Sequence, residues 1–196
     1  MKKIKLSFIL FIAVVGALLI YNNFDHVDVE KKEIDKFLEE YTLLDENHAY
    51  EIKNIDEIIN ILNNKTGIIF FCNSGSDWCQ YYAKMLDDVA VKNNINKIYY
   101  IDIKEDRNNN STKYQKIVKK LYDYLDIDDT GNKRLSMPML VFIKNGNVIA
   151  SDTTTYRVSS DTTPKEYWTD LNITNFENRI NEYIDLLNNY EKEEIK

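Results

Sequence analysis

The sequence predicts an α/β domain with a mixed central sheet flanked by helices, and three observations lead to this fold class. Short apolar runs alternate with amphipathic stretches from Ile68 onward, which is typical of parallel strands joined by helices. Two further apolar runs are joined by Asn145-Gly146, a strong indication of an antiparallel hairpin. A last amphipathic stretch follows the hairpin. The expected order is therefore strand, helix, strand, helix, strand, strand, helix.

An N-terminal membrane segment is predicted before this domain. Three lysines lie among the first five residues and an apolar run covers residues 6–20, the pattern of a signal anchor or a signal peptide. As a helix, residues 4–20 would span roughly 25 Å, the lower limit for crossing a bilayer. No small-x-small cleavage site follows the run, which favours an uncleaved anchor over residues 1–21. The remainder is then expected outside the cytoplasm, tethered to the cell membrane, or secreted if the segment is cleaved.

Residues 22–50 predict an amphipathic helix or stalk, because apolar side chains recur at mostly helical spacing between residues 27 and 44. The α/β domain itself is assigned to residues 51–196. Within it, Asn54 caps a short helix. The wholly apolar run 68–72 is bounded by turn residues, which is typical of a strand buried on both faces.

The later elements follow from the same periodicities. Helices are predicted over residues 79–91 and 112–125, and strands over residues 97–103, 139–143 and 148–150. Thr174 and Glu177 predict a capping box that opens a last helix, residues 175–190. The polar stretch 151–171 is a long excursion before that helix, and loops of this length are often functional.

Composition limits the classes of function. The 196 residues include 25 Lys and Arg against 32 Asp and Glu, a net charge of −7, and 44% are hydrophobic. An acidic balance without a basic block beyond the N-terminus argues against a nucleic-acid partner. Two cysteines and two histidines are too few for a disulfide scaffold or an obvious metal site. We therefore expect no metal and no cofactor, and thiol chemistry or none.

Cys79 is the main candidate for chemistry. It follows a buried strand and a loop and, with Trp78, stands in the first turn of a predicted helix. Backbone N–H groups and the helix dipole favour an anion at such a place, which would make the thiol a nucleophile. The alternative is an inert cysteine at a helix start. A second feature is Pro138, which begins an apolar strand, where it costs no central hydrogen bond and where either a trans or a cis peptide bond is possible.

Together these features resemble the thioredoxin-like superfamily. The resemblance depends on residues 75–79 (GSDWC), residues 137–142 (MPMLVF) and residues 144–146 (KNG), and it covers about residues 65–148. Each motif is weak alone, but their order and spacing are fairly specific. The chain is similar to the membrane-anchored, extracytoplasmic thioredoxin-like proteins of Gram-positive bacteria.

The resemblance implies roles for four residues. Cys79 would be the attacking thiol, and Trp78, Met137 and Pro138 would flank the substrate beside it. In the CxxC motif of the family, a resolving cysteine stands three residues after the first. Here that position is Tyr82, so the motif is a degenerate CxxY. Two-cysteine chemistry at a CxxC motif is therefore impossible.

Cys72 offers a second thiol. It ends the predicted strand, and the loop after it could fold back so that its sulfur meets Cys79, provided the two Cα atoms lie within roughly 7 Å. The alternative, a small buried hydrophobe at a strand end, agrees equally well with the sequence. The family often places an acid before the motif to handle protons, whereas Asn73 stands six residues before Cys79.

Three functions compete. The first is extracytoplasmic thiol–disulfide exchange with protein thiols or disulfides, through Cys79 with Cys72 as resolving thiol. The second is a non-catalytic thioredoxin-like module that holds extracytoplasmic peptide segments in a groove near Met137, Pro138 and the excursion 151–171. The third is a Cys72–Cys79 disulfide that only cross-links the loop. We take the first as the prediction and the second as its alternative.

Overall fold

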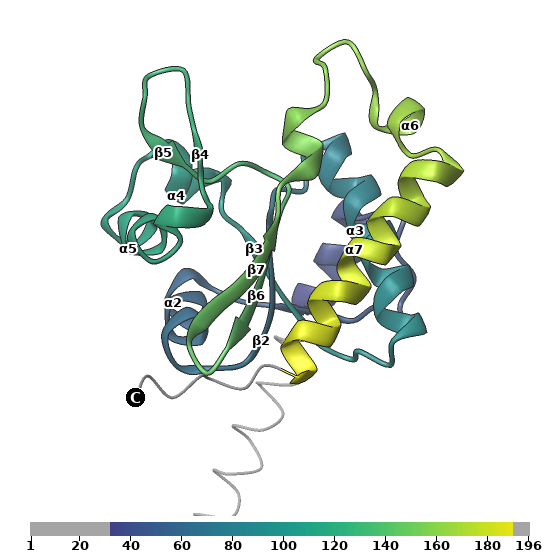
Figure 1. The fold of residues 1–196 in the computed structure, drawn as a ribbon, viewed down its shortest axis with the longest axis horizontal. Coiled ribbons are helices and arrows are strands. Elements are labelled where there is room, and N and C mark those ends of the chain that lie inside the picture. Colours follow the sequence, from purple (N-terminus) through teal and green to yellow (C-terminus); the bar gives the residue numbers. More distant parts are fainter. Residues whose placement is uncertain (1–31, 190–196) are drawn as a thin grey trace, which may run out of the picture. The chain divides into compact units, whose positions relative to one another are not determined.

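The computed structural model of the chain describes residues 32–189 (Figure 1). The chain divides into two compact units, residues 1–39 and 40–196. Residues 32–40 are helical, in agreement with part of the helix predicted over residues 27–44. The predicted membrane segment, residues 1–21, lies outside the described residues. In the described part of the chain, no helix is both long and apolar enough to span a membrane.

The second unit is an α/β domain. Its elements follow one another along the chain as β1 (Tyr50–Ile52), α2 (Ile55–Asn64), β2 (Gly67–Cys72), α3 (Asp77–Lys92), β3 (Ile98–Asp102), α4 (Lys104–Asn108), α5 (Thr112–Lys120), a 3-10 turn (Tyr122–Tyr124), β4 (Asp126–Ile127), β5 (Lys133–Arg134), β6 (Met139–Lys144), β7 (Asn147–Asp152), a second 3-10 turn (Thr154–Arg157), α6 (Pro164–Tyr167) and α7 (Asp170–Asn189).

A mixed five-stranded sheet forms the centre of this domain, with the strand order β1-β3-β2-β6-β7. β1, β3 and β2 are parallel, whereas β6 and β7 run antiparallel to their neighbours. Figure 1 shows α2, α4 and α5 on one side of the sheet and α3 and α7 on the other. The predicted fold class, a mixed sheet flanked by helices, is therefore confirmed and agrees with a thioredoxin-like fold.

Strand β2 is buried on both faces, as its apolar run predicts. Alternate side chains of a strand point to opposite faces. Ile69 and Phe71 belong to the core cluster that also contains residues of α2 and α5. Phe70 faces the other way and stacks on Tyr82 of α3, with 5.3 Å between ring centroids. Cys72 has the parity of Phe70 and therefore faces α3.

Several predicted boundaries need correction. α3 begins at Asp77, two residues before the predicted start. α7 begins at Asp170 rather than at residue 175, and the hydroxyl of Thr174 donates to the carbonyl of Asp170 inside the helix. The capping box predicted at Thr174 is therefore wrong, because that residue lies within the helix instead of at its start. Glu177 forms an ion pair with Lys92 of α3.

The shortest elements are not predicted by the sequence pattern. They are β1, α4 and the small antiparallel pair of β4 and β5, and two to five residues are too few to show a periodic pattern. The excursion 151–171 contains the second 3-10 turn and α6, whose start is capped by Thr163 and Glu166. The hairpin between β6 and β7 is confirmed, with Asn145 at φ 49° and Gly146 at φ 71°.

Gly146 provides a test of this packing. A Cβ at this position would lie 2.1 Å from the carbonyl oxygen of Asn63, and the φ angle is one that alanine adopts only with strain. We expect Gly146→Ala to lower the free energy of unfolding by about 2 kcal/mol or more, measured by chemical denaturation. Gly131→Ala is the matched control, because Gly131 has φ +83° but no atom within 4 Å of its Cβ position. Equal losses in the two variants would contradict the close contact with Asn63.

Candidate functional site

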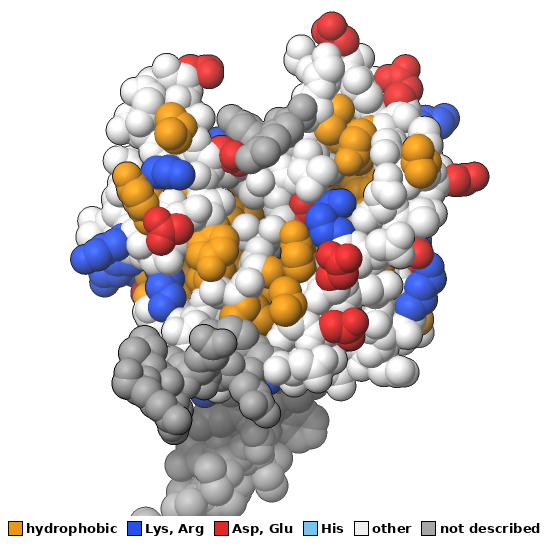
Figure 2. Space-filling view, viewed as in Figure 1, with side chains coloured by type: hydrophobic (Ala, Val, Ile, Leu, Met, Phe, Trp, Pro, Cys, Tyr) orange, Lys and Arg blue, Asp and Glu red, His pale blue; other side chains and the backbone are white. Residues whose placement is uncertain are grey.

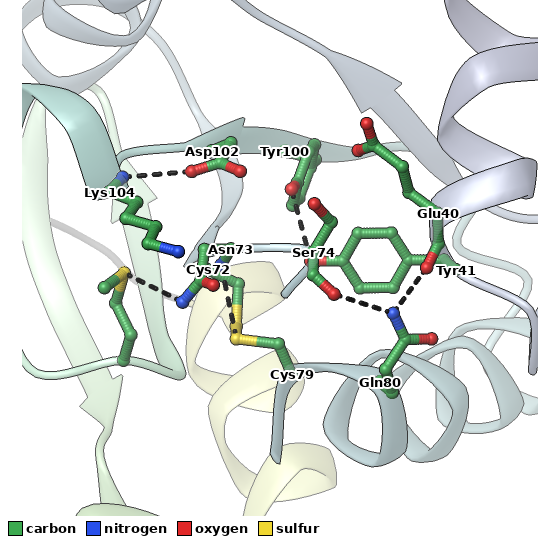
Figure 3. Close-up of a disulfide and its surroundings, with 11 residues drawn as sticks. Glu40, Tyr41, Cys72, Asn73, Ser74, Cys79, Gln80, Tyr100, Asp102 and Lys104 are labelled. Carbon is green, nitrogen blue, oxygen red and sulfur yellow. Dashed lines mark hydrogen bonds between the residues drawn. A yellow bond between two sulfur atoms is a disulfide. The ribbon is translucent and has the colours of Figure 1, made fainter. Parts of the chain in front are cut away.

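A disulfide joins Cys72, the last residue of β2, to Cys79 in the first turn of α3 (Figure 3). The two Cα atoms lie 5.9 Å apart, within the range that a disulfide requires. The pairing follows from the strand's alternation, which directs Cys72 toward α3. Of the two alternatives that the sequence leaves open for Cys72, the structure contains the paired one.

The loop between the two cysteines closes over the sulfur atoms. Both cysteine side chains have 0% exposure. The backbone N–H of Asn73 donates to Cys79 Sγ at 3.3 Å, and the N–H of Ser76 donates to the Asn73 carbonyl at 3.3 Å. The side-chain amide of Gln80 donates to the Ser74 carbonyl at 3.0 Å. In this conformation a second protein cannot reach either sulfur.

Ser76 occupies the N-cap position of α3, and its side chain makes no capping hydrogen bond. The residue is half-buried, whereas Cys79, three residues later, is fully buried. Ser76 and Cys79 therefore have the spacing of a CxxC pair, with a hydroxyl at the more exposed position. The role of Cys79 as an attacking thiol stays a prediction.

Tyr82, at the position of the resolving cysteine in a CxxC reading from Cys79, points into the core. Its hydroxyl donates to Asp152 Oδ2 at 3.0 Å, and Asp152 also accepts from Arg179 at 3.0 Å. Burial raises the pKa of Tyr82 well above its ordinary value, and the carboxylate of Asp152 raises it further. Tyr82 therefore remains neutral. Its hydrogen bond to Asp152, which also binds Arg179, connects α3 to β7 and α7.

Met137 and Pro138 lie beside the disulfide loop. Their peptide bond is cis, Pro138 is buried, and β6 begins at the next residue. The side-chain amide of Asn73 contacts Met137 Sδ at 3.9 Å. Trp78 instead packs edge-on against Tyr167 of α6, with ring centroids 5.5 Å apart. The structure thus gathers the two cysteines, Met137 and Pro138, while the Trp78 ring contacts the excursion.

Lys104 is a residue of this site that the sequence analysis did not identify. It lies two residues after the end of β3, and its ammonium group lies 3.8 Å from the Cβ position of Gly75, in the loop over the disulfide. Neighbouring parallel strands end at the same edge of a sheet. The position of Lys104 after β3 was therefore the available indication that it lies near the end of β2. Within residues 32–189, no three His, Cys, Asp or Glu side chains gather where they could hold a metal ion.

No family model matches the chain, and no curated protein matches it. Among solved structures, oxidized thioredoxin O2 from Arabidopsis thaliana is similar, with a TM-score of 0.41 and 13% sequence identity. The match covers 69% of this chain and 94% of the thioredoxin. The description of the fold depends on the sheet order and on the helices that cover the two faces of the sheet.

Proposed function

We propose that the protein carries out thiol–disulfide exchange with protein substrates through Cys79, with Cys72 as the resolving thiol. The observation that supports this proposal is the disulfide itself, which joins a strand end to a helix start beside Met137 and cis-Pro138. This location brings together a reactive bond, the N-terminal end of a long helix and a neighbouring loop for a substrate chain.

The reduced pair would react in two steps. The Cys79 thiolate attacks a substrate disulfide, a mixed disulfide forms, and one substrate sulfur leaves as a thiolate. Cys72 then loses its proton, attacks Cys79 Sγ, and releases the second substrate thiolate, so the protein becomes oxidised as the substrate is reduced. The Asn73 N–H at 3.3 Å and the start of α3 stabilise negative charge on Cys79.

Burial of both sulfurs means that the loop 73–76 must open before exchange. The bonds that hold it are few, namely those of Asn73, Ser76 and Gln80 described above. Each neutral hydrogen bond of this kind contributes about 1 kcal/mol net. A local opening of the loop therefore requires only a small part of the free energy of global unfolding.

We further propose that the protein is a membrane-anchored, extracytoplasmic thioredoxin-like protein of the Gram-positive type. The lysines and apolar run of residues 1–21 support the anchor, and a disulfide is stable mainly in oxidising compartments. Its partners would be protein thiols or disulfides and peptide segments outside the cytoplasm. A CxxY motif at residues 79–82 leaves Cys72 as the second thiol.

A second candidate function is a peptide-binding module whose disulfide only cross-links the loop, because both sulfurs have 0% exposure. A cavity of about 740 Å³ is lined by residues 123–127, by Lys133, by residues 151–154 and by Tyr183. Figure 2 shows a hollow between the part of the surface that carries β4 and β5 and the part formed by the excursion. A peptide in this hollow would contact the first residues of the excursion.

A trapping experiment tests the exchange reaction. In Cys72→Ser the second step is blocked, so the mixed disulfide with a reducible protein substrate should accumulate on Cys79 and disappear on addition of dithiothreitol. In Cys79→Ser no such adduct should form, because the attacking thiolate is absent. The adducts are measured by non-reducing electrophoresis and mass spectrometry. Absence of an adduct in both variants would favour the binding module.

A redox titration distinguishes an exchange disulfide from a structural one. Exchange disulfides have potentials of about −270 mV or higher, whereas structural disulfides lie below about −300 mV. We expect the Cys72–Cys79 disulfide of the full-length protein to equilibrate with glutathione buffers in the higher range, measured by mass spectrometry after alkylation. A disulfide that stays oxidised at −300 mV in the folded protein would contradict the proposed exchange.

A further inference from the structure

We propose that Lys104 forms an anion subsite beside the Cys72–Cys79 disulfide. Exchange would then be faster with thiols and disulfides that carry a negatively charged group close to sulfur. The inference specifies the substrate class of the proposed function and rests on that function.

The backbone fixes Lys104 at the same edge of the sheet as the disulfide. Lys104 is the first residue of α4 and lies two positions after Asp102, whose partner across β2 and β3 is Cys72. The backbone N–H of Lys104 donates to Asp102 Oδ1 at 3.0 Å. This hydrogen bond fixes the backbone of Lys104 next to β2, the strand that ends in Cys72.

The ammonium group reaches the loop over the disulfide. Lys104 Nζ lies 3.8 Å, and Asn73 Oδ1 3.5 Å, from the position that a Cβ on Gly75 would occupy. Figure 3 shows the Lys104 side chain extending toward Asn73 and Cys72. Asn73 in turn contacts Met137 and donates to Cys79 Sγ, so the residue toward which the ammonium extends connects the loop to the cis-Pro segment and to the disulfide.

The charge of Lys104 is available to an incoming group. In the described part of the chain, no carboxylate forms an ion pair with its ammonium and no side chain accepts a hydrogen bond from it. Asp102 and Glu105, which lie within two residues of Lys104 along the chain, are exposed. Lys104 therefore places a positive charge beside the loop, 3.8 Å from the Cβ position of Gly75.

The reaction brings negative charge to this place. A small thiolate attacks one sulfur of the disulfide, a new S–S bond forms, and the other cysteine leaves as a thiolate. A second small thiolate then attacks the sulfur of the bound small thiol, the bond from that sulfur to the protein breaks, and the protein cysteine leaves as a thiolate. Two small thiols thus become one disulfide as the protein gains two electrons. A nearby cation increases the local concentration of an anionic thiol and stabilises the charge on sulfur.

The test compares three small thiols that differ in charge: anionic 2-mercaptoethanesulfonate, neutral 2-mercaptoethanol and cationic cysteamine. The second-order rate constant for reduction of the disulfide in the full-length protein is measured for each and divided by its thiolate fraction. We expect Lys104→Met to lower the ratio of the anionic to the neutral rate constant about fourfold, the effect of one charge at roughly 5 Å in water. Lys104→Arg should keep the ratio.

Two controls make the result specific. Lys116→Met removes an exposed lysine of α5 and should leave the ratio unchanged, which excludes an effect of net charge. A purely structural defect in Lys104→Met would change all three rate constants by the same factor. An unchanged ratio in Lys104→Met, with measurable reduction, would overturn the subsite and leave the proposed function standing. A wild-type disulfide that none of the three thiols reduces in the folded protein would overturn both.

Discussion

The burial of β2 on both faces is the constraint from which the candidate site follows. The strand lies between β3 and β6 and has helices on each side, so its side chains can only alternate between two apolar cores. A shift of one residue would exchange the two faces and direct Cys72 away from α3. The packing of Phe70 against Tyr82 on one face and of Phe71 in the core cluster on the other fixes this register.

Helix α3 is held in place by a polar contact as well as by apolar packing. Tyr82 reaches Asp152 at the end of β7, and Arg179 of α7 contacts the same carboxylate. A buried charge of this kind is costly unless it is paired and hydrogen-bonded, and here both conditions are met. The departure from CxxC at residue 82 is thus explained by packing, since a cysteine there would leave Asp152 without one of its donors.

The sequence was sufficient for the central part of the fold. The apolar run ending in Cys72, the Asn145-Gly146 turn and the proline before β6 each carry a local physical cause, and the structure contains the strand, the hairpin and the cis bond. The pairing of the cysteines could not be decided, because it depends on how the loop folds back. For Lys104 the sequence offers only its place after β3, since its relation to Gly75 arises only when β3 and β2 are paired.

The disulfide encloses only the six residues between Cys72 and Cys79, which limits how far its effects extend. Closing so small a ring stabilises the folded chain by about 2.5 kcal/mol in the chain-entropy model. That free energy concerns one loop and one helical turn, while the sheet and its covering helices keep their own contacts. Reduction or oxidation of the disulfide would therefore change the order of this loop and of the first turn of α3 only. A binding partner that recognises this loop and helical turn could distinguish the two redox states without any rearrangement of the fold.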